Sequence, residues 1–528
     1  MTMAERLKKW IAKNKREFGA ICLILFIATV MRTWRINEYM TFLGDEGRDV
    51  RIVSKIITQG NLTFIGPMTS VTTSSGHMYL GPAYYYLMAP ALFLSNLSPV
   101  GPALMVALLS VVTCGLIWWV GRSWFAPMAG LIAALIYAVS PTIIIYSRSS
   151  WNPNVMPLFA ILAVWFGYQA RRNSKWWIGS SAMIALALQS HYLGLLLVPV
   201  VGLIWLEKIW GEWKESKRIS KETWKHSLLA IVVFGLFLIP QLLFESKHGW
   251  INMRALSAFF TERQTSVNLK FYKKMGELWP LIKSIFNSII GGISLGKKET
   301  SLTVEITIAA LGLTTLLGVW RKKITFAYLI MLAWFGFGIL GLLSYKQNIF
   351  DHYLGFMYPL LPLMVGWLVW QISEKSQTWD NCGGCLQMRK FWAGLLTFGI
   401  VWQLLIHNPL QSNPNRQWQK TQEIADLIIE KSNGKPFNLG LIADGNYDEG
   451  YRYALERKKS QLTAIDPQIK NTTTDQLFVI CEMTCNPIGH PQSEIANFGW
   501  AVIEDQWQAE ESGYKIYKLG HYMEGKEN

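Results

Sequence analysis

The chain has 528 residues and a formal net charge of +15, with 51% hydrophobic residues against 16% charged ones. Soluble globular proteins carry about 25% charged residues, so this composition argues against a string of soluble domains. The positive charge does not predict nucleic-acid binding, because no basic recognition motif accompanies it. Apolar stretches of about 20 residues recur, which is the length a helix needs to cross a bilayer. We therefore expect a polytopic α-helical membrane protein.

The N-terminal segment 1–17 is basic and precedes an apolar stretch without a small-residue cleavage site. We expect a cytoplasmic N-terminus followed by an uncleaved first span. The hydropathy pattern predicts about eleven membrane-spanning helices, at residues 18–34, 100–120, 128–146, 154–170, 176–190, 193–207, 228–245, 303–320, 324–343, 354–372 and 391–407. Lys and Arg lie mainly in the short connections that this arrangement places inside, as the positive-inside rule requires. The transmembrane domain would then cover residues 18–410.

Two long loops are predicted outside the membrane, at residues 35–99 and 246–302. Within the first loop, residues 81–95 are apolar but too short to span as a helix, and Pro90 interrupts them. Counting them as a span would also place the later basic loops outside. We expect instead a helix lying in the membrane interface, with its tyrosines at the level of the lipid headgroups.

After the last span, residues 411–528 are predicted to form a small extracytoplasmic α/β domain. Apolar periodicity predicts a helix at 418–431 and short strands at 438–442, 476–481 and 514–519. Cys481 and Cys485 could form a local disulfide there. Cys382 and Cys385 form a CGGC sequence in a loop placed inside, where reduced thiols are favoured over a metal or redox site.

An acidic motif follows the first span, with the sequence Gly44-Asp45-Glu46-Gly47-Arg48-Asp49. Carboxylates at a membrane boundary need partners or water, and are often functional. The simpler interpretation is a solvated loop after a span. The glycines on both sides of the acidic pair and the long aromatic loop that follows favour a functional site.

The acidic pair after the first span is followed by a loop with a His-x-x-x-Gly-Pro-x-Tyr-Tyr pattern and then by many spans. The residues of this pattern are His77, Gly81, Pro82, Tyr84 and Tyr85. Over residues 15–370 the chain resembles membrane glycosyltransferases of the GT-C class. Within that class it is most similar to family 39, which includes protein O-mannosyltransferases and aminoarabinose transferases.

The resemblance implies a GT-C fold and an inverting transfer of a sugar from a polyprenyl-phosphate donor. The acceptor would be a hydroxyl of a protein, lipid or glycan at the outer face of the plasma (inner) membrane. Asp45 matches the acid proposed to deprotonate the acceptor, and Glu46 matches the acid that helps to position it. Arg48 is placed like an arginine that contacts the donor phosphate, and His77 stands where relatives have a polar active-site residue.

Other polar residues are predicted at the outer ends of spans. Arg148 could bind the donor phosphate or could simply extend to the interface. His352 and Tyr353 are candidates for contact with the donor lipid phosphate, and His191 and Asp351 for binding the sugar or the acceptor. For the histidines, packing within the protein remains an alternative.

No residue pattern has the spacing of a committed metal site, so we predict no metal ligands, although the histidines and aspartates would permit a divalent cation. No cofactor is predicted. The main rival function is a transporter or flippase of a lipid-linked sugar. Transporters tend to contain repeated halves with charges near the bilayer midplane, whereas the notable charges here lie at outer span ends.

Overall fold

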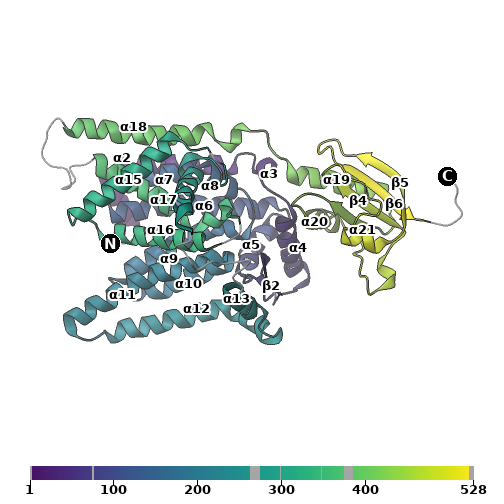
Figure 1. Cartoon of the computed structure of the whole chain (residues 1–528), viewed down its shortest axis with the longest axis horizontal. Helices are drawn as coiled ribbons and strands as arrows, with labels where there is room; N and C mark the ends of the chain where they lie inside the picture. The colour runs from purple at the N-terminus through teal and green to yellow at the C-terminus, as the bar shows by residue number, and fades with distance from the viewer. Residues whose placement is uncertain are drawn as a thin grey trace.

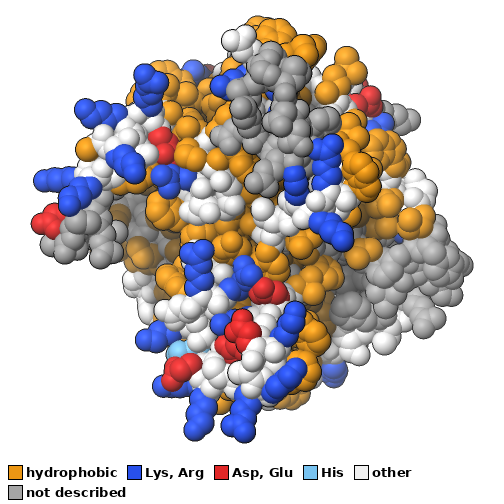
Figure 2. Space-filling model, turned by 90° about the vertical axis from the view of Figure 1, so that its left-hand side faces the viewer, with side chains coloured by type: hydrophobic (Ala, Val, Ile, Leu, Met, Phe, Trp, Pro, Cys, Tyr) orange, Lys and Arg blue, Asp and Glu red, His pale blue; other side chains and the backbone are white. Residues whose placement is uncertain are grey.

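The structure is a computed structural model that describes residues 3–73, 76–261, 274–297, 299–345, 348–373 and 385–522. A long body of helices carries a small sheet domain at one end (Figure 1). The opposite end of the body displays many Lys and Arg side chains among apolar ones (Figure 2). Most of the CGGC sequence and the middle of the second long loop lie outside the described residues.

Helices occupy every apolar stretch that the hydropathy pattern predicts. They are α2 (Lys15–Thr33), α6 (Val100–Trp124), α7 (Pro127–Val139) with α8 (Pro141–Tyr146), α9 (Met156–Ala170), α10 (Trp176–Ser190), α11 (Leu197–Ser216), α12 (Lys221–Lys247), α15 (Leu302–Trp320), α16 (Phe326–Ser344), α17 (Leu360–Ser373) and α18 (Cys385–Ile406). Among the described residues, 6 helices are long and apolar enough to cross a membrane, or 7 when one bent pair is counted as a span. The bent pair joins η5 (Asp351–Met357) to α17 at 56°.

One predicted span is broken in its C-terminal half. The stretch 128–146 forms α7 and α8, which meet at Ser140 because Pro141 begins a new helix there. The fully buried Arg32 of α2 donates hydrogen bonds to the carbonyl groups of Tyr137 and Ala138, 3.0 and 2.9 Å away. These bonds satisfy carbonyls that the end of α7 would otherwise leave unpaired.

Small residues bring the central helices close together. A Cβ atom on Gly366 of α17 would lie only 2.2 Å from the carbonyl oxygen of Ala129 on α7. Such close approach is typical of helix packing in membranes, where van der Waals contact replaces the hydrophobic effect as the driving force. Helices α6, α7 and α17 therefore form the packed centre of the body.

Short elements cover the end of the body next to the sheet domain (Figure 1). They are α3 (Ile36–Tyr39), α4 (Gly44–Gln59), the antiparallel strands β1 (Met68–Thr73) and β2 (Gly76–Tyr79), α5 (Ala83–Leu94), η1 (Asn152–Val155), η2 (Tyr192–Leu196), α13 (Ile251–Thr261), α14 (Met275–Phe286), η4 (Asn287–Gly291) and η6 (Pro409–Gln411). At the other end, α1 (Met3–Lys13) precedes α2. Helix α5 has 12 residues and is about 18 Å long, so it is too short to span.

The C-terminal domain contains a four-stranded mixed sheet in the order β3-β4-β6-β5. Its elements are α19 (Gln417–Lys431), β3 (Asn438–Ile442), α20 (Glu449–Arg457), η7 (Lys470–Thr472), β4 (Gln476–Cys481), α21 (Ser493–Phe498), β5 (Ala501–Gln508) and β6 (Lys515–His521). Strands β3 and β4 pair in parallel, and the other pairs are antiparallel. The predicted helix and the three predicted strands are confirmed, and β5 is an additional strand.

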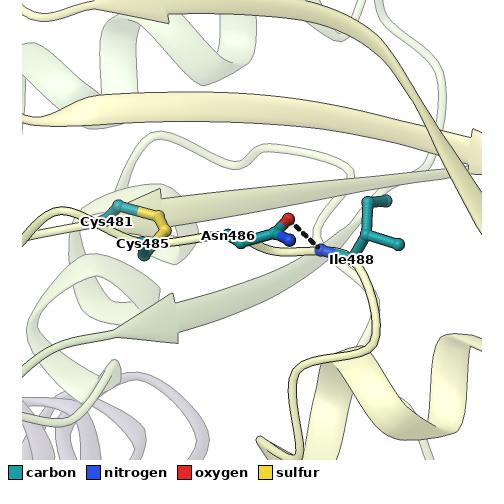
Figure 3. The surroundings of a disulfide bond; sticks show 4 residues. All are labelled: Cys481, Cys485, Asn486 and Ile488. Atoms are coloured by element: carbon teal, nitrogen blue, oxygen red, sulfur yellow. Dashed lines mark hydrogen bonds between the residues drawn. A yellow bond between two sulfur atoms is a disulfide. The ribbon is translucent and has the colours of Figure 1, made fainter.

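The predicted local disulfide is also present. Cys481, the last residue of β4, is bonded to Cys485 in the loop that follows (Figure 3). In the same loop the Asn486 side chain accepts a hydrogen bond from the Ile488 amide at 3.1 Å. The bridge closes a short loop that carries Glu482, a residue that contacts the candidate active site.

Candidate active site

The acidic motif forms the first turns of helix α4 rather than a loop. Glu46 accepts a hydrogen bond from the Leu43 amide at 3.1 Å, which satisfies a donor at the start of the helix. The side chain of Glu46 is buried, and burial raises its pKa to about 7 against the opposing effect of backbone hydrogen bonds. Glu46 therefore can hold or release a proton near neutral pH.

Arg48 joins two carboxylates of the motif. Its Nη1 donates to Asp45 Oδ1 at 2.7 Å, and its Nη2 donates to Asp49 Oδ1 at the same distance of 2.7 Å. Asp49 is fully buried, whereas 38% of the Asp45 side chain is exposed. Burial raises the pKa of Asp49 to about 6, and the Arg48 guanidinium opposes this rise. Asp45 is therefore the carboxylate of this cluster that a substrate can reach.

Tyr447 of the C-terminal domain completes the cluster. Its hydroxyl donates a hydrogen bond to Asp45 Oδ1 and accepts one from Arg48 Nη1 at 3.1 Å. The neighbouring Asn446 side chain accepts a hydrogen bond from the Gly44 amide at 2.9 Å. A Cβ atom on Gly44 would lie 2.5 Å from the Tyr447 ring, so only glycine fits there without a shift.

The C-terminal domain packs along the first half of helix α4, from Gly44 to Arg51. A Cβ atom on Gly47 would lie 2.3 Å from the Gly450 amide nitrogen, at the start of α20. One turn further, Arg51 forms ion pairs with Glu449 at 2.9 Å and with Glu456 at 2.6 Å. The two glycines of the acidic motif therefore allow two domains to meet at the candidate site.

The tyrosines of α5 form the floor of the cluster. Tyr84 and Tyr85 are buried in the protein, so the expectation that they lie among lipid headgroups is wrong for both. The Tyr84 hydroxyl is 2.8 Å from Ser150 Oγ. The Tyr85 hydroxyl and Asp49 Oδ2 are both buried without a hydrogen-bond partner within the described part of the chain, and the two groups interact electrostatically. Only Tyr86 is exposed.

A second group of predicted residues gathers where α10 ends and where η5 leads into α17. The rings of His191 and Tyr353 are 5.0 Å apart between centroids, and those of His191 and His352 are 6.2 Å apart. The ring centroids of Trp151 and His352 are 4.4 Å apart. Burial lowers the pKa of His191 to about 4, so its ring is neutral at physiological pH. Burial also lowers the pKa of His352, to about 3, so the group is aromatic and uncharged, with Tyr353 buried and the two histidines half-buried.

Asp351 points away from this aromatic group. Its Oδ1 accepts hydrogen bonds from Ser288 Oγ at 2.6 Å and from the Leu295 amide at 3.0 Å. Leu295 also lines an open cavity of about 700 Å³ between α14 and the C-terminal end of α16. Asp351 therefore fixes the segment after α14, beside that cavity.

Two predicted residues lie apart from both groups. Arg148 is buried, and it donates hydrogen bonds to the carbonyl groups of Met31 and Trp34, 2.8 and 2.6 Å away. It therefore supports the end of α2 in this structure. His77 lies exposed on strand β2, paired with Thr72 of β1.

The segment from Tyr146 to Asn152 connects these separate groups. Arg148 contacts the end of α2, Ser150 contacts Tyr84 beside the acidic cluster, and Trp151 packs against His352. Within the described ranges, no group of three or more His, Cys, Asp or Glu side chains is arranged to hold a metal ion. The candidate site thus combines an acidic and a neutral aromatic part.

Sequence reasoning did not identify Tyr447, Asn446 or Tyr85 as parts of the site. Asn446 and Tyr447 are about 400 positions from the acidic motif, and no local pattern reveals such a contact. The glycines around the acidic pair were the available signal, because glycine in a helix often marks a close backbone approach.

A protein-family profile described as "Dolichyl-phosphate-mannose-protein mannosyltransferase" matches residues 80–244, about a third of the chain. A direct sequence comparison with curated proteins gives no match. The structure is similar to that of ArnT from Cupriavidus metallidurans bound to undecaprenyl phosphate, with a TM-score of 0.59 and 14% identity over 95% of this chain and 98% of that one.

Two further solved structures have a similar fold. The apo state of the same ArnT gives a TM-score of 0.57 and 15% identity, over 95% of this chain and 98% of that one. The archaeal oligosaccharyltransferase AglB from Archaeoglobus fulgidus, in complex with an inhibitory peptide and a dolichol-phosphate, gives 0.53 and 11% identity. In that comparison, 89% of this chain and 70% of the other are covered.

The fold is that of a multi-pass membrane protein similar to ArnT. An ArnT-like arrangement of helices carries a C-terminal domain with a mixed sheet. Residues 80–244 resemble the mannosyltransferase profile, and the fold over 95% of the chain resembles that of ArnT.

Proposed function

We propose that this chain is a glycosyltransferase, and that it transfers a sugar from a polyprenyl-phosphate donor to an acceptor hydroxyl at the outer face of the plasma membrane, with Asp45 as general base. The observation that carries the proposal is the position of Asp45. It is the exposed carboxylate of a buried acidic cluster, held by Arg48 where the membrane helices meet the C-terminal domain. A base at that boundary can reach an acceptor in water and a donor in the membrane.

The choice of donor rests on the relatives. The solved ArnT binds undecaprenyl phosphate, and the solved AglB binds a dolichol-phosphate. Both lipids are polyprenyl phosphates, and the matched family profile is named for a dolichyl-phosphate sugar donor. A polyprenyl-phosphate sugar is therefore the donor class that we propose for this chain.

The proposed reaction is a single displacement that inverts the anomeric centre. The acceptor oxygen forms a bond to the anomeric carbon while Asp45 takes the hydroxyl proton. The bond between that carbon and the phosphate oxygen breaks, and its electron pair leaves with the polyprenyl phosphate. A phosphate already bears negative charge, so a nearby cation can stabilise it without a second acid. Arg48 is the cation of the cluster, and we assign it that role.

The remaining predicted residues have supporting roles in this proposal. Glu46 would position the acceptor beside Asp45. His191, His352 and Tyr353 offer neutral aromatic surface that suits a sugar ring or the first prenyl units of the donor. Arg148 acts through the end of α2 rather than by direct contact, given its two backbone partners.

We further propose about eleven membrane spans, with residues 1–17 in the cytoplasm, 18–410 in the transmembrane domain and 411–528 outside. The Lys and Arg side chains at the end opposite the C-terminal domain support this orientation (Figure 2). The disulfide between Cys481 and Cys485 also supports it, because disulfides persist in oxidising compartments outside the cytoplasm.

The rival proposal is a flippase for a lipid-linked sugar. The reaction product distinguishes it from a glycosyltransferase. We would reconstitute the full chain in liposomes with undecaprenyl-phosphate sugars that carry different radiolabelled hexoses and pentoses, and with bacterial envelope extract as acceptor. A glycosyltransferase releases free undecaprenyl phosphate and transfers the label. A flippase moves the labelled lipid across the bilayer and leaves it intact.

The matched variants are Asp45→Asn and Asp505→Asn, since Asp505 is an exposed aspartate on β5 far along the chain. Loss of a general base lowers a rate by about 100-fold to 10,000-fold. We expect Asp45→Asn to lose release of undecaprenyl phosphate to that extent and Asp505→Asn to retain it. Translocation of intact donor without release would instead support the flippase.

A further inference from the structure

Tyr447 is the one residue outside α4 whose side chain hydrogen-bonds to the Asp45 carboxylate in the described part of the chain. Burial raises the pKa of Tyr447 well above its usual range, although Arg48 opposes the rise, so the hydroxyl keeps its proton as a donor. The contact therefore joins the proposed base in the membrane domain to a tyrosine in the C-terminal domain.

The position of Tyr447 is fixed from its own domain. Asn446 Oδ1 accepts hydrogen bonds from the Tyr447 amide and the Gly44 amide, each 2.9 Å away. Asn446 Nδ2 in turn donates to Glu482 Oε1 at 2.7 Å. Glu482 lies inside the loop that the Cys481–Cys485 disulfide closes. A chain of contacts thus leads from the disulfide to the proposed base.

The two oxygens of Asp45 have different surroundings. Oδ1 accepts hydrogen bonds from both Arg48 and Tyr447, whereas Oδ2 accepts none from the residues that the structure describes. The side chain is 38% exposed, so Oδ2 is the oxygen open to an acceptor. The torsion angle that orients an aspartate carboxylate has a broad distribution, so two donors on one oxygen restrict the orientation more than one donor does.

We propose that Tyr447 is a positioning residue for glycosyl transfer, which holds Asp45 Oδ1 so that Oδ2 faces the acceptor hydroxyl. The C-terminal domain is then part of the catalytic unit. This inference rests on the proposed role of Asp45 as the base. Arg48 gives Asp45 a single hydrogen bond through Nη1, because its Nε and Nη2 donate to Asp49, 2.9 and 2.7 Å away. Tyr447 therefore supplies the second donor to Asp45.

The test is Tyr447→Phe in the full chain, measured in the same liposomes with the labelled donor that wild type consumes fastest. The matched control is Tyr522→Phe, because Tyr522 is 59% exposed on the same domain. We expect kcat to fall about tenfold in Tyr447→Phe, the effect of one lost hydrogen bond to a charged group, with an unchanged KM for the donor. Tyr522→Phe should match wild type.

A pH profile separates positioning from general damage to the fold. The titratable and charged groups around Asp45 are Glu46, Arg48 and Asp49 on α4, Tyr85 on α5, and Tyr447. Tyr447→Phe changes only the last of these groups, and the charged form of Asp45 loses one hydrogen-bond donor. The acid limb of kcat/KM should therefore move to higher pH. A loss of folded protein would lower the whole profile without moving that limb.

Gly44→Ala provides a second variant if Tyr447→Phe folds poorly. Its new methyl group would displace the Tyr447 ring while leaving the hydroxyl on the chain. It should lower kcat and move the acid limb in the same direction. An acid limb at the wild-type position in both variants would overturn the inference.

Asp45→Asn, run alongside, keeps the two claims separate. Full activity in Asp45→Asn would overturn the proposed base, whatever Tyr447→Phe does. Loss of activity in Asp45→Asn together with wild-type kinetics in Tyr447→Phe would overturn only the role of Tyr447.

Discussion

Replacing Gly47 with alanine tests the docking of the C-terminal domain on α4. Within a helix, alanine is more favourable than glycine by about 1 kcal/mol, so helix propensity alone predicts a more stable protein. The structure predicts the opposite sign. The new Cβ atom would lie 2.3 Å from the amide nitrogen of Gly450 and 2.4 Å from its Cα atom.

These distances fall more than about 1 Å short of ordinary contact between such atoms, which is about 3.5–4.0 Å. All of the atoms are backbone, so α20 must move away as a unit and strain the ion pairs that Arg51 forms with Glu449 and Glu456. Overpacking of this kind costs about 1–3 kcal/mol. We therefore expect a net loss of stability at the interface for Gly47→Ala.

Thermal unfolding followed by tryptophan fluorescence measures this change, and limited proteolysis between α18 and α19 reports release of the C-terminal domain. The matched control is Gly211→Ala in α11, where a Cβ atom would meet nothing within 4 Å. It should unfold at the wild-type temperature or above. If Gly47→Ala proves as stable and as protease-resistant as Gly211→Ala, the described contact between α4 and α20 is wrong.

Two further predictions concern Glu46 and the disulfide. Burial raises the pKa of Glu46 from 4.5 to about 7, so the folded protein binds more protons than the unfolded chain in that window and loses stability as pH rises through it. Glu46→Gln cannot ionise, so its free energy of unfolding should rise relative to that of wild type by about 3 kcal/mol as the pH increases from 4.5 to 7. If the unfolding temperatures of the two proteins change with pH in parallel, the burial argument is contradicted. Reducing the Cys481–Cys485 bridge, whose sequence separation is 4, should cost the C-terminal domain about 2 kcal/mol, seen as a lower unfolding temperature with reductant. Cys485→Ser should not respond to reductant, and an equal response in both proteins would refute a stabilising bridge.

Local patterns in the sequence predicted the elements that local forces determine. The helices follow the apolar stretches, and β3 and β4 have the bounds that their apolar residues predict. Strand β5 was missed because it lies at the edge of the sheet and its residues 502–506 are exposed, so no buried face produces an alternating pattern. The break at Ser140 was missed because the apolar stretch continues through it.

The site was predicted only in part, for a physical reason. Asp45, Glu46 and Arg48 are close in sequence, so their grouping could be predicted from one motif. Tyr447 reaches them through the docking of a separate domain, which depends on the shape of two surfaces rather than on a local pattern. Tyr85 was placed among the lipid headgroups, although α5 turns it toward Asp49.

The central claim is that Asp45 removes the acceptor proton. Its most direct test is the initial rate at which Asp45→Asn releases undecaprenyl phosphate from labelled donor in liposomes. Asp505→Asn is measured in parallel, and each reaction contains the same amount of folded protein. The account predicts a rate about 100-fold or more below wild type for Asp45→Asn and a wild-type rate for Asp505→Asn. A wild-type rate in Asp45→Asn would contradict it.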